Sequence, residues 1–288
     1  MFVDASLGPA GPGGDGPLAP TPPRGASLRR VVVPALSEAE IFDEVMVTPR
    51  RAFPPLRDLR VIERPGWLQI VTPSITTGSL NEVLVSALDE RDADAVIDTT
   101  IAEYRALGLQ FRWSVGPGSA PGDLGERLER HGLVASWGRG MARSTSAAAA
   151  VDDPAIRIAE VDAATIDAFS QVVARGWNFE PRPLADVHAQ ILAAPERRQR
   201  MFLAYHRGEP AAAASYVAYP RSAYLIGGVV LPPHRGRGLY RALVLARLGH
   251  ARIRGIALAT THARESTSVP ILEHLGFATI CRFARYFG

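Results

Sequence analysis

The chain has one cysteine, no lysine and no long apolar stretch, and each absence excludes a class of protein. A single cysteine, Cys281, excludes an internal disulfide framework and fits a reducing compartment such as the cytoplasm. We expect it to be a buried, inert thiol in the last strand. No apolar run approaches the roughly 18 residues of a membrane span, so we expect no membrane partner. Without lysine the chain cannot form a Walker-type phosphate loop, which needs Gly-Lys-Ser/Thr.

A strong excess of charge of one sign is also missing. The 32 basic residues, all arginine, face 29 acidic ones, which gives a net charge of +3. The arginines are scattered along the chain rather than grouped on one helix. This balance favours a modest attraction for an anionic cofactor over a nucleic-acid surface. We expect no nucleic-acid partner and no metal site.

Composition divides the chain into four segments. Residues 1–27 are rich in Gly and Pro and poor in large apolar residues, so we expect a disordered tail. The tail lacks the basic start and apolar core of a secretory signal. A second low-complexity segment, 144–154, reads as a linker between two domains, 28–143 and 155–288. Each of these is long enough to bury a core.

The most informative motif is a turn at residues 235–240, Arg-Gly-Arg-Gly-Leu-Tyr. A strand-like segment, 224–231, precedes it, and a helical segment, 241–248, follows. Glycines let a backbone approach a phosphate closely, and the unpaired N–H groups of a first helical turn point at it. The turn therefore predicts a phosphorylated ligand. A dinucleotide site is excluded, because Arg241 stands where its third glycine would be.

The segment from Val229 to Tyr240 resembles motif A of the GCN5-related N-acetyltransferases (GNAT), Gln/Arg-x-x-Gly-x-Gly/Ala behind a strand. Arg235 and Gly238 match this pattern, whereas Tyr240 replaces a small residue and crowds the pyrophosphate. The next strand (255–261), a helix (268–274) with Leu-Gly-Phe after it, and a last strand (278–287) follow in the family's order. The resemblance covers residues 156–288. It implies an α+β fold with a mixed, mostly antiparallel central sheet flanked by helices.

The resemblance implies that acetyl-CoA, or another acyl-CoA, binds at this turn. It assigns the cofactor contacts to the strand end, the turn and the last helix: Val229, Val230, Leu231, Arg235, Gly236, Arg237, Gly238, Leu239, Tyr240, Ser266 and Ser268. A backbone N–H near Val230 would polarise the thioester carbonyl. Ser268 could instead cap a helix. Gly227 and Gly228 fit either a bulge that makes room for pantetheine or simple close packing.

The family's acceptor site is lined by the loop between the first two helices of the domain. Here that loop carries Trp177 and Phe179, and Tyr224 is a further candidate for contact with the acceptor. The two loop aromatics could equally fill the core behind the sheet.

Acid and base groups of the family are missing. No Asp or Glu lies in the strand from Tyr224 to Leu231, and the family's Asn and Tyr near the last helix are Glu265 and Leu272 here. Glu180 is our candidate for the catalytic base. Other candidates are Tyr224, His234 and His262, and each of them also has an ordinary reading as a solvated or structural polar group.

The two halves of the chain resemble one another. Residues 128–133 (Leu-Glu-Arg-His-Gly-Leu) parallel 272–277 (Leu-Glu-His-Leu-Gly-Phe), 144 positions further on. The same offset places Asp94 opposite Gly238, in a segment with four carboxylates and no glycine. Carboxylates at a helix start suit the helix dipole but repel a bound anion. We therefore expect a tandem GNAT protein whose first copy is degenerate and binds no cofactor.

Together these features predict an acetyl-CoA-dependent N-acetyltransferase that acts directly on the primary amine of a small molecule. Two alternatives stay open: a non-catalytic acyl-CoA-binding module, and an enzyme that acts on a protein amine. We expect a cytoplasmic monomer or homodimer.

Overall fold

The structure, a computed structural model, describes residues 36–51, 56–76, 78–146, 153–178 and 181–288. The predicted tail (1–27) lies outside these ranges, and the predicted linker is described only at its two ends.

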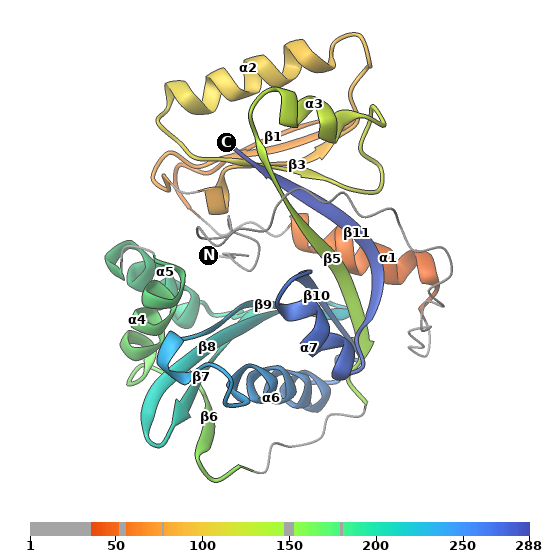
Figure 1. Cartoon of the computed structure of the whole chain (residues 1–288). Coiled ribbons are helices and arrows are strands. Elements are labelled where there is room, and N and C mark those ends of the chain that lie inside the picture. The colour runs from red at the N-terminus through yellow and green to blue at the C-terminus, as the bar shows by residue number, and fades with distance from the viewer. Residues whose placement is uncertain (1–35, 52–55, 77, 147–152, 179–180) are drawn as a thin grey trace. The chain divides into compact units, whose positions relative to one another are not determined.

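Helices and strands alternate in two stretches of the described chain, from β3 to β5 and from β9 to β11 (Figure 1). The helices are α1 (Glu38–Met46), α2 (Ala93–Ala106), α3 (Leu124–Arg130), α4 (Ile166–Trp177), α5 (Pro181–Ala193), α6 (Leu239–Ile253) and α7 (Ser268–His274). The strands are β1 (Arg60–Arg64), β2 (Trp67–Val71), β3 (Glu82–Ser86), β4 (Arg112–Val115), β5 (Val134–Ser144), β6 (Ile156–Glu160), β7 (Gln199–His206), β8 (Glu209–Ala218), β9 (Ser222–Val230), β10 (Leu258–Arg264) and β11 (Ala278–Phe287).

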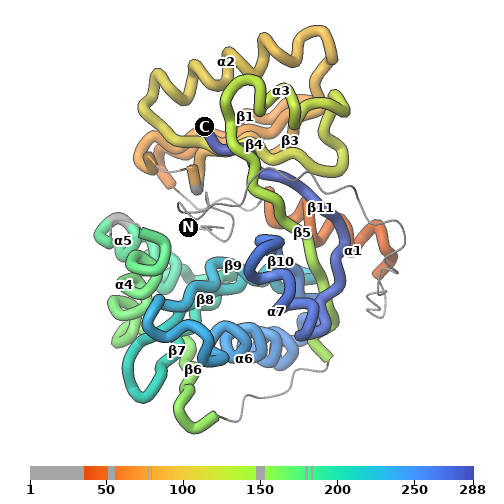
Figure 2. The backbone as a smooth tube through the Cα atoms, in the orientation of Figure 1, coloured from red at the N-terminus to blue at the C-terminus, as the bar shows by residue number. Residues whose placement is uncertain are grey.

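The chain folds into two compact units, which Figure 2 traces by colour. The described residues of Val31–Pro55 and Gly140–Phe277 form the C-terminal unit; those of Leu56–Arg139 and Ala278–Gly288 form the N-terminal unit. These boundaries differ from the expected domains, because α1 belongs to the C-terminal unit and β11 to the N-terminal unit. The order of the elements in the sequence does not determine to which unit α1 and β11 belong. The open edge of a set of strands can accept a strand from either end of the chain.

In the C-terminal unit the strand order is β5-β10-β9-β8-β7-β6. The strands from β6 to β9 pair antiparallel, and β9 and β10 are parallel. Successive side chains of a strand point to opposite faces. Leu225 packs with Leu243 of α6, whereas its neighbour Ile226 lies with Val173 of α4. Helices α6 and α4 therefore cover opposite faces of this sheet.

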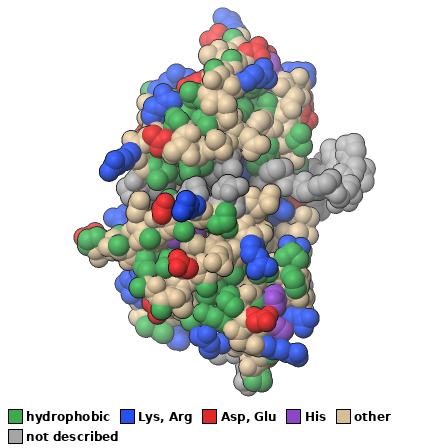
Figure 3. Space-filling view, turned by 90° about the vertical axis from the view of Figure 1, so that its left-hand side faces the viewer, with side chains coloured by type: hydrophobic (Ala, Val, Ile, Leu, Met, Phe, Trp, Pro, Cys, Tyr) green, Lys and Arg blue, Asp and Glu red, His purple; other side chains and the backbone are tan. Residues whose placement is uncertain are grey.

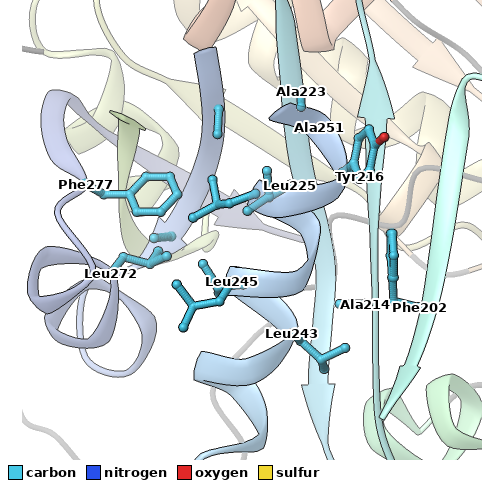
Figure 4. Packing of buried hydrophobic residues seen from close by; sticks show 14 of the residues in the cluster. Phe202, Ala214, Tyr216, Ala223, Leu225, Leu243, Leu245, Ala251, Leu272 and Phe277 are labelled. Atoms are coloured by element: carbon cyan, nitrogen blue, oxygen red, sulfur yellow. The ribbon is translucent and has the colours of Figure 1, made fainter. Parts of the chain in front are cut away.

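The main core of this unit lies between the sheet and helices α6 and α7 (Figure 4). Tyr216 and Leu225 contribute from the strands, and Leu243, Leu272 and Phe277 from α6, α7 and the residues after it; all five are buried. Burial of large apolar side chains such as these contributes about 1.5–3 kcal/mol each. The core fixes the start of α6 against the end of β9.

In the N-terminal unit the strand order is β1-β2-β3-β4-β11-β5, with β3 and β4 parallel. The order β3-α2-β4-α3 repeats the order β9-α6-β10-α7 of the other unit. Both α3 and α7 have seven residues, and they begin at Leu124 and Ser268, 144 positions apart. The offset found in the sequence therefore relates equivalent elements.

The predicted α+β class is confirmed: mixed, mostly antiparallel pairing is flanked by helices. Cys281 lies in β11 as expected but is only half-buried. None of the helices in the described part of the chain combines the length and apolar character needed to cross a membrane.

Candidate functional site

The glycine-rich turn joins the end of β9 to the start of α6. Gly236 and Gly238 have φ angles of +74° and +78°, a region that glycine adopts without strain. Gly238 is the N-cap of α6, and its carbonyl accepts from the Ala242 N–H at 2.9 Å. The N–H groups of residues 239–241 thus have no partner within the helix, and no acidic residue lies in this first turn. The helix start can bind an anion.

Strands β9 and β10 are paired only along their first halves. Their pairing ends at Leu225 opposite Thr261, although β9 continues to Val230 and β10 to Arg264. The second half of β9 therefore has an open edge on the side of β10.

On its other side β9 carries a bulge against β8. Ser215 pairs with Ile226 and Ala213 with Val229, so two glycines of β9, 227 and 228, face one residue of β8. A Cβ on Gly228 would lie 2.8 Å from the Tyr240 ring. The two sequence interpretations, a bulge and a close approach, both describe this site.

The Val230 N–H points to the open edge. Leu231 N donates to the Ala211 carbonyl of β8 at 2.9 Å. Backbone groups of neighbouring strand residues point to opposite edges, so the N–H and carbonyl of Val230 face away from β8. Arg235 Nε donates to this carbonyl at 3.2 Å. The N–H is oriented as the predicted thioester contact requires.

A cavity of about 590 Å³ connects the open edge with the start of α6. It is lined by nine of the residues that the sequence assigned to ligands: Trp177, Val229, Val230, Arg235, Gly236, Gly238, Leu239, Tyr240 and Ser268. The described lining residues include four arginines and two histidines (Arg235, Arg241, Arg247, Arg264, His234 and His262) and no Asp or Glu. The cavity is therefore electropositive and suits a polyanionic ligand.

Other predicted residues lie elsewhere. Leu231, Arg237 and Ser266 are not among the lining residues. Tyr224 is buried in a small cluster with Tyr219 and Ile226, outside the lining. The predicted base Glu180 and the predicted acceptor contact Phe179 lie outside the described residues.

Ser268 is the first residue of α7 rather than its cap, which is Thr267. Its Oγ accepts from the Arg264 N–H at 3.0 Å and ties α7 to the end of β10.

Sequence reasoning missed Arg247, a buried arginine of α6. Its Nη1 donates to the carbonyls of Ser215 (2.9 Å) and Ile226 (3.3 Å), and its Nε donates to Leu243. Burial lowers the pKa of Arg247 to about 10, so it stays cationic at neutral pH. The guanidinium holds β8 and β9 where the bulge begins. An arginine four positions after Leu243, on the apolar side of the helix, was the available signal.

The face of the sheet covered by α4 and α5 carries a smaller cavity of about 20 Å³ beside Trp177 and Gly227. Two buried polar atoms here, Trp177 Nε1 and Gln199 Oε1, have no hydrogen-bond partner among the described residues. One is a donor and the other an acceptor. They can orient a polar group of a ligand next to the bulge.

His188 of α5 lines the same small cavity. Ser170 Oγ donates to the Ile166 carbonyl at 2.9 Å, so His188 Nδ1 donates to Ser170 Oγ at 2.8 Å. Burial lowers the pKa of His188 to about 3, which keeps the ring neutral.

The corresponding helix start in the N-terminal unit is occupied by acidic residues. Asp92 is the N-cap of α2, and Asp94 lies in its first turn. Asp94 accepts from Arg127 Nη1 at 2.5 Å and lies 3.1 Å from His131 Nε2. These ion pairs lie at the helix start, where the first turn of α6 has no acidic residue.

The corresponding strand edge is closed as well. After β3 and β4 diverge, Ala120 N donates to the Ser86 carbonyl at 3.0 Å, and Leu88 N donates to the Ala120 carbonyl at 2.9 Å. Fully buried Trp113 donates from Nε1 to Ser86 Oγ at 2.9 Å. The segment around Ala120 fills the gap that is open beside β9.

Comparison with known proteins identifies this arrangement. Residues 165–277 match the model of the family described as Acetyltransferase (GNAT) family. The matched residues lie within the C-terminal unit. The GNAT match includes the bulge, the turn and all of α6 and α7, and so covers the whole described cavity lining. No curated protein matches the chain in sequence.

Solved structures extend the likeness to both units. A GCN5-related N-acetyltransferase from Kribbella flavida is 16% identical, with a TM-score of 0.61 over 80% of this chain and 90% of that one. One from Sphaerobacter thermophilus is 16% identical, with a TM-score of 0.56 over 90% and 94%. A tandem GNAT protein from the clavulanic acid biosynthesis pathway is 16% identical, with a TM-score of 0.54 over 86% and 93%. The tandem GNAT fold predicted from sequence is confirmed.

Proposed function

We propose that the chain transfers an acyl group, acetyl in the first instance, from coenzyme A to the primary amine of a small molecule. One observation carries the proposal: the second half of β9, which is not paired with β10, and the glycine-capped start of α6 line one cavity. The turn would hold the pyrophosphate, and the Val230 N–H would polarise the thioester carbonyl. Bound acyl-CoA supplies the activated acyl group.

The geometry of the C-terminal unit suits direct transfer. The donor side of the sheet is that of α6, and Trp177 with the small cavity lies on the side of α4 and α5. The glycine bulge at 227 and 228 connects the two sides without side chains. Thioester and amine can therefore meet at the open edge of β9, and such positioning supplies much of the rate of a transfer reaction.

We propose one coenzyme A site per chain. Phosphates at the start of α2 would meet Asp92 and Asp94, and a pantetheine chain beside β3 would meet Ala120 and Trp113. The N-terminal unit is on this proposal a degenerate copy. On the face shown in Figure 3, basic and acidic side chains are interspersed, which supports a small-molecule acceptor over a nucleic acid.

A second candidate function is an acyl-CoA-binding module without turnover. The observation that favours it is the lack of a carboxylate among the described lining residues. An enzyme that acts on a protein amine is a third candidate, and the same assay separates it from the first.

The test is an assay of free thiol release from acetyl-CoA with a library of small amines and amine-bearing peptides, beside calorimetry with coenzyme A. We expect binding of one coenzyme A per chain and thiol release that depends on a small amine. Binding without turnover across the library would overturn transfer in favour of the binding module.

A further inference from the structure

His262 lies where the two strands separate. It follows Thr261, the last residue of β10 that pairs with β9, and its ring lines the cavity while only 5% exposed. It lies on the face of the sheet opposite α6, because its neighbour Ala263 packs in the core against that helix. Trp177 and the small cavity are on this same face.

A contact with α1 determines the tautomer of His262. Nε2 lies 2.9 Å from the backbone carbonyl of Val45. A carbonyl can only accept, so Nε2 carries a proton, and the basic nitrogen of the neutral ring is Nδ1. The Tyr224 ring packs edge-on against the imidazole with centroids 5.3 Å apart, which fixes the plane of the ring.

Helix α1 is itself anchored to the sheet beside this histidine. Glu44, which is only 4% exposed, accepts from Ser222 Oγ at the start of β9 and from Arg221 Nε at 2.9 Å. Arg221 also donates to Glu40 at 2.8 Å. Hydrogen bonds to a buried carboxylate are among the stronger ones in proteins. The position of the Val45 carbonyl therefore depends on this network.

The other described histidines near the site are less suited to accept a proton. His234 lies at the phosphate turn, with its Nδ1 3.4 Å from Nδ1 of His206. His188 lines only the small cavity, and its Nδ1 is hydrogen-bonded to Ser170 Oγ. Of these three histidines, only His262 lies where the thioester and the amine would meet in the proposed transfer.

We propose that His262 is the proton acceptor for the amine and that α1, through Val45, is the element that positions it. This inference rests on the proposed transfer. Nδ1 takes one proton from the ammonium group of the acceptor and releases it to solvent. The amine nitrogen then forms a bond to the thioester carbon, and the carbon–sulfur bond breaks. The second proton leaves the nitrogen and ends on the coenzyme A thiolate, which gives an amide and a free thiol.

The decisive variant is His262→Gln. A glutamine amide can keep the donor to the Val45 carbonyl but cannot take up a proton. We expect kcat/KM for an alkylamine to fall about 100-fold or more, within the range usual for a lost general base. We expect the affinity for coenzyme A, measured by calorimetry, to stay unchanged, because the turn at 235–240 is untouched.

Amines of different pKa distinguish a proton acceptor from a residue that only supports the structure. A purely structural role of His262 would give the same loss of kcat/KM with every amine. With an amine that is already neutral at pH 7, such as an aromatic amine, His262→Gln should lose less than about tenfold. Three charged or titratable side chains lie close to His262 on the elements packed against it: buried Glu44 of α1, Tyr224 of β9 and Arg264 of β10. The other acidic residues of α1 are Glu38, Glu40 and Asp43. An equal loss with both amines would overturn the role as proton acceptor.

A pair of matched variants in α1 tests whether this helix positions His262. Glu44→Gln removes the charge that anchors α1, whereas Asp43→Asn makes the same change at an exposed position of the same helix. We expect kcat for an alkylamine to fall about tenfold in the first and to stay unchanged in the second, with coenzyme A affinity retained in both. Nitrogen NMR of the His262 ring should show protonated Nε2 in the wild type and loss of that single tautomer in Glu44→Gln.

The outcomes separate the two levels of the argument. If the wild type binds coenzyme A but acylates no amine, the proposed transfer fails. If the wild type acylates amines and His262→Gln acylates alkylamines equally well, the transfer stands and the role of His262 is overturned. A His262 ring with protonated Nδ1 in the wild type would also overturn the inference, without any activity measurement.

Discussion

The starts of α6 and α2 follow equivalent strands in the two units, yet their residues differ in ways that bear on anion binding. The start of α6 has Gly236 and Gly238 with positive φ and no acidic side chain; the start of α2 has Asp92 and Asp94. In one unit the helix dipole is available to a ligand, and in the other the chain's own carboxylates occupy it. Topology therefore supplies a place for a ligand, and local residues decide whether one can bind.

The strand edges show the same contrast. Beside β9 the Val230 N–H faces an open gap, whereas beside β3 the segment at Ala120 provides the missing backbone partners. Unpaired backbone groups are costly once buried. In the N-terminal unit these backbone groups of β3 are paired by the segment at Ala120, next to buried Trp113. The covering helices differ too, because α4 and α5 have no counterpart among the described residues of that unit.

The largest effect is expected for Trp113→Ala, which removes the side chain that fills the gap in the N-terminal unit. Trp113 is fully buried and packs edge-on against Trp67 with centroids 5.5 Å apart. We expect the free energy of unfolding of this unit to fall by about 3–5 kcal/mol, measured by urea denaturation. Coenzyme A affinity should stay within about twofold if the site lies in the C-terminal unit alone. Trp137→Ala, at a half-exposed position of β5, is the control and should cost far less.

The next effect tests the helix start directly. Gly238→Asp places at the N-cap of α6 the residue type found at the N-cap of α2, Asp92, and Gly238→Asn is its uncharged control. Both side chains tolerate a positive φ better than other residues do. A carboxylate about 4 Å from a phosphate costs about 4 kcal/mol before screening by salt, so we expect affinity for coenzyme A to fall about 100-fold more in Asp than in Asn. Calorimetry gives both this ratio and the expected stoichiometry of one. Equal affinities of the two variants for coenzyme A, or two coenzyme A sites per chain, would contradict the proposal that only the start of α6 binds the cofactor.

The contrast itself was largely predictable from sequence. A strand, a glycine turn and a helix start are local features, and the offset of 144 positions places a carboxylate, Asp94, opposite Gly238. In the structure Asp94 lies in the first turn of α2, and the N-cap equivalent to Gly238 is Asp92. The bulge at Gly227 was likewise one of two expected readings. Such features are determined by residues that are close together in the sequence, so they can be predicted from it.

The parts that sequence did not predict are long-range contacts. The exchange of α1 and β11 between the units, and the hydrogen bond from His262 to Val45, join residues about 200 positions apart. The periodic pattern of apolar residues predicts helices and strands but not which distant residues contact one another. Arg247 was missed for another reason: its partners are backbone carbonyls, which leave no trace in the residue types of Ser215 and Ile226.

A smaller effect is expected from Trp177→Phe, on the side of the sheet that has no equivalent in the N-terminal unit. The change keeps an aromatic ring but removes Nε1, which is buried and has no partner among the described residues. If this N–H donates to the acceptor, its loss should raise KM for the amine about 5–10-fold, the usual worth of one hydrogen bond. Affinity for coenzyme A and kcat at saturation should change little. An unchanged KM would assign Trp177 to the core instead.

The smallest effect concerns the acidic start of α2. Hydrogen bonding to His131, together with the charge of Arg127, lowers the pKa of Asp94 below its ordinary value. The folded state therefore favours the ionised form. Asp94 contributes stability above its unfolded-state pKa, and this contribution is lost as the pH falls through its lower folded-state pKa.

Asp94→Asn should accordingly lower the urea midpoint of the N-terminal unit at pH 7 and leave a smaller difference from the wild type at pH 3. Asp92→Asn removes an equal charge from the same helix start, where Asp92 makes no capping hydrogen bond, and is the control for a change of charge alone. Neither variant should create a second coenzyme A site, because Ala120 and Trp113 still close the strand edge. A second site in Asp94→Asn would mean that the carboxylate alone separates the two units, and that the closed edge can open to admit a ligand.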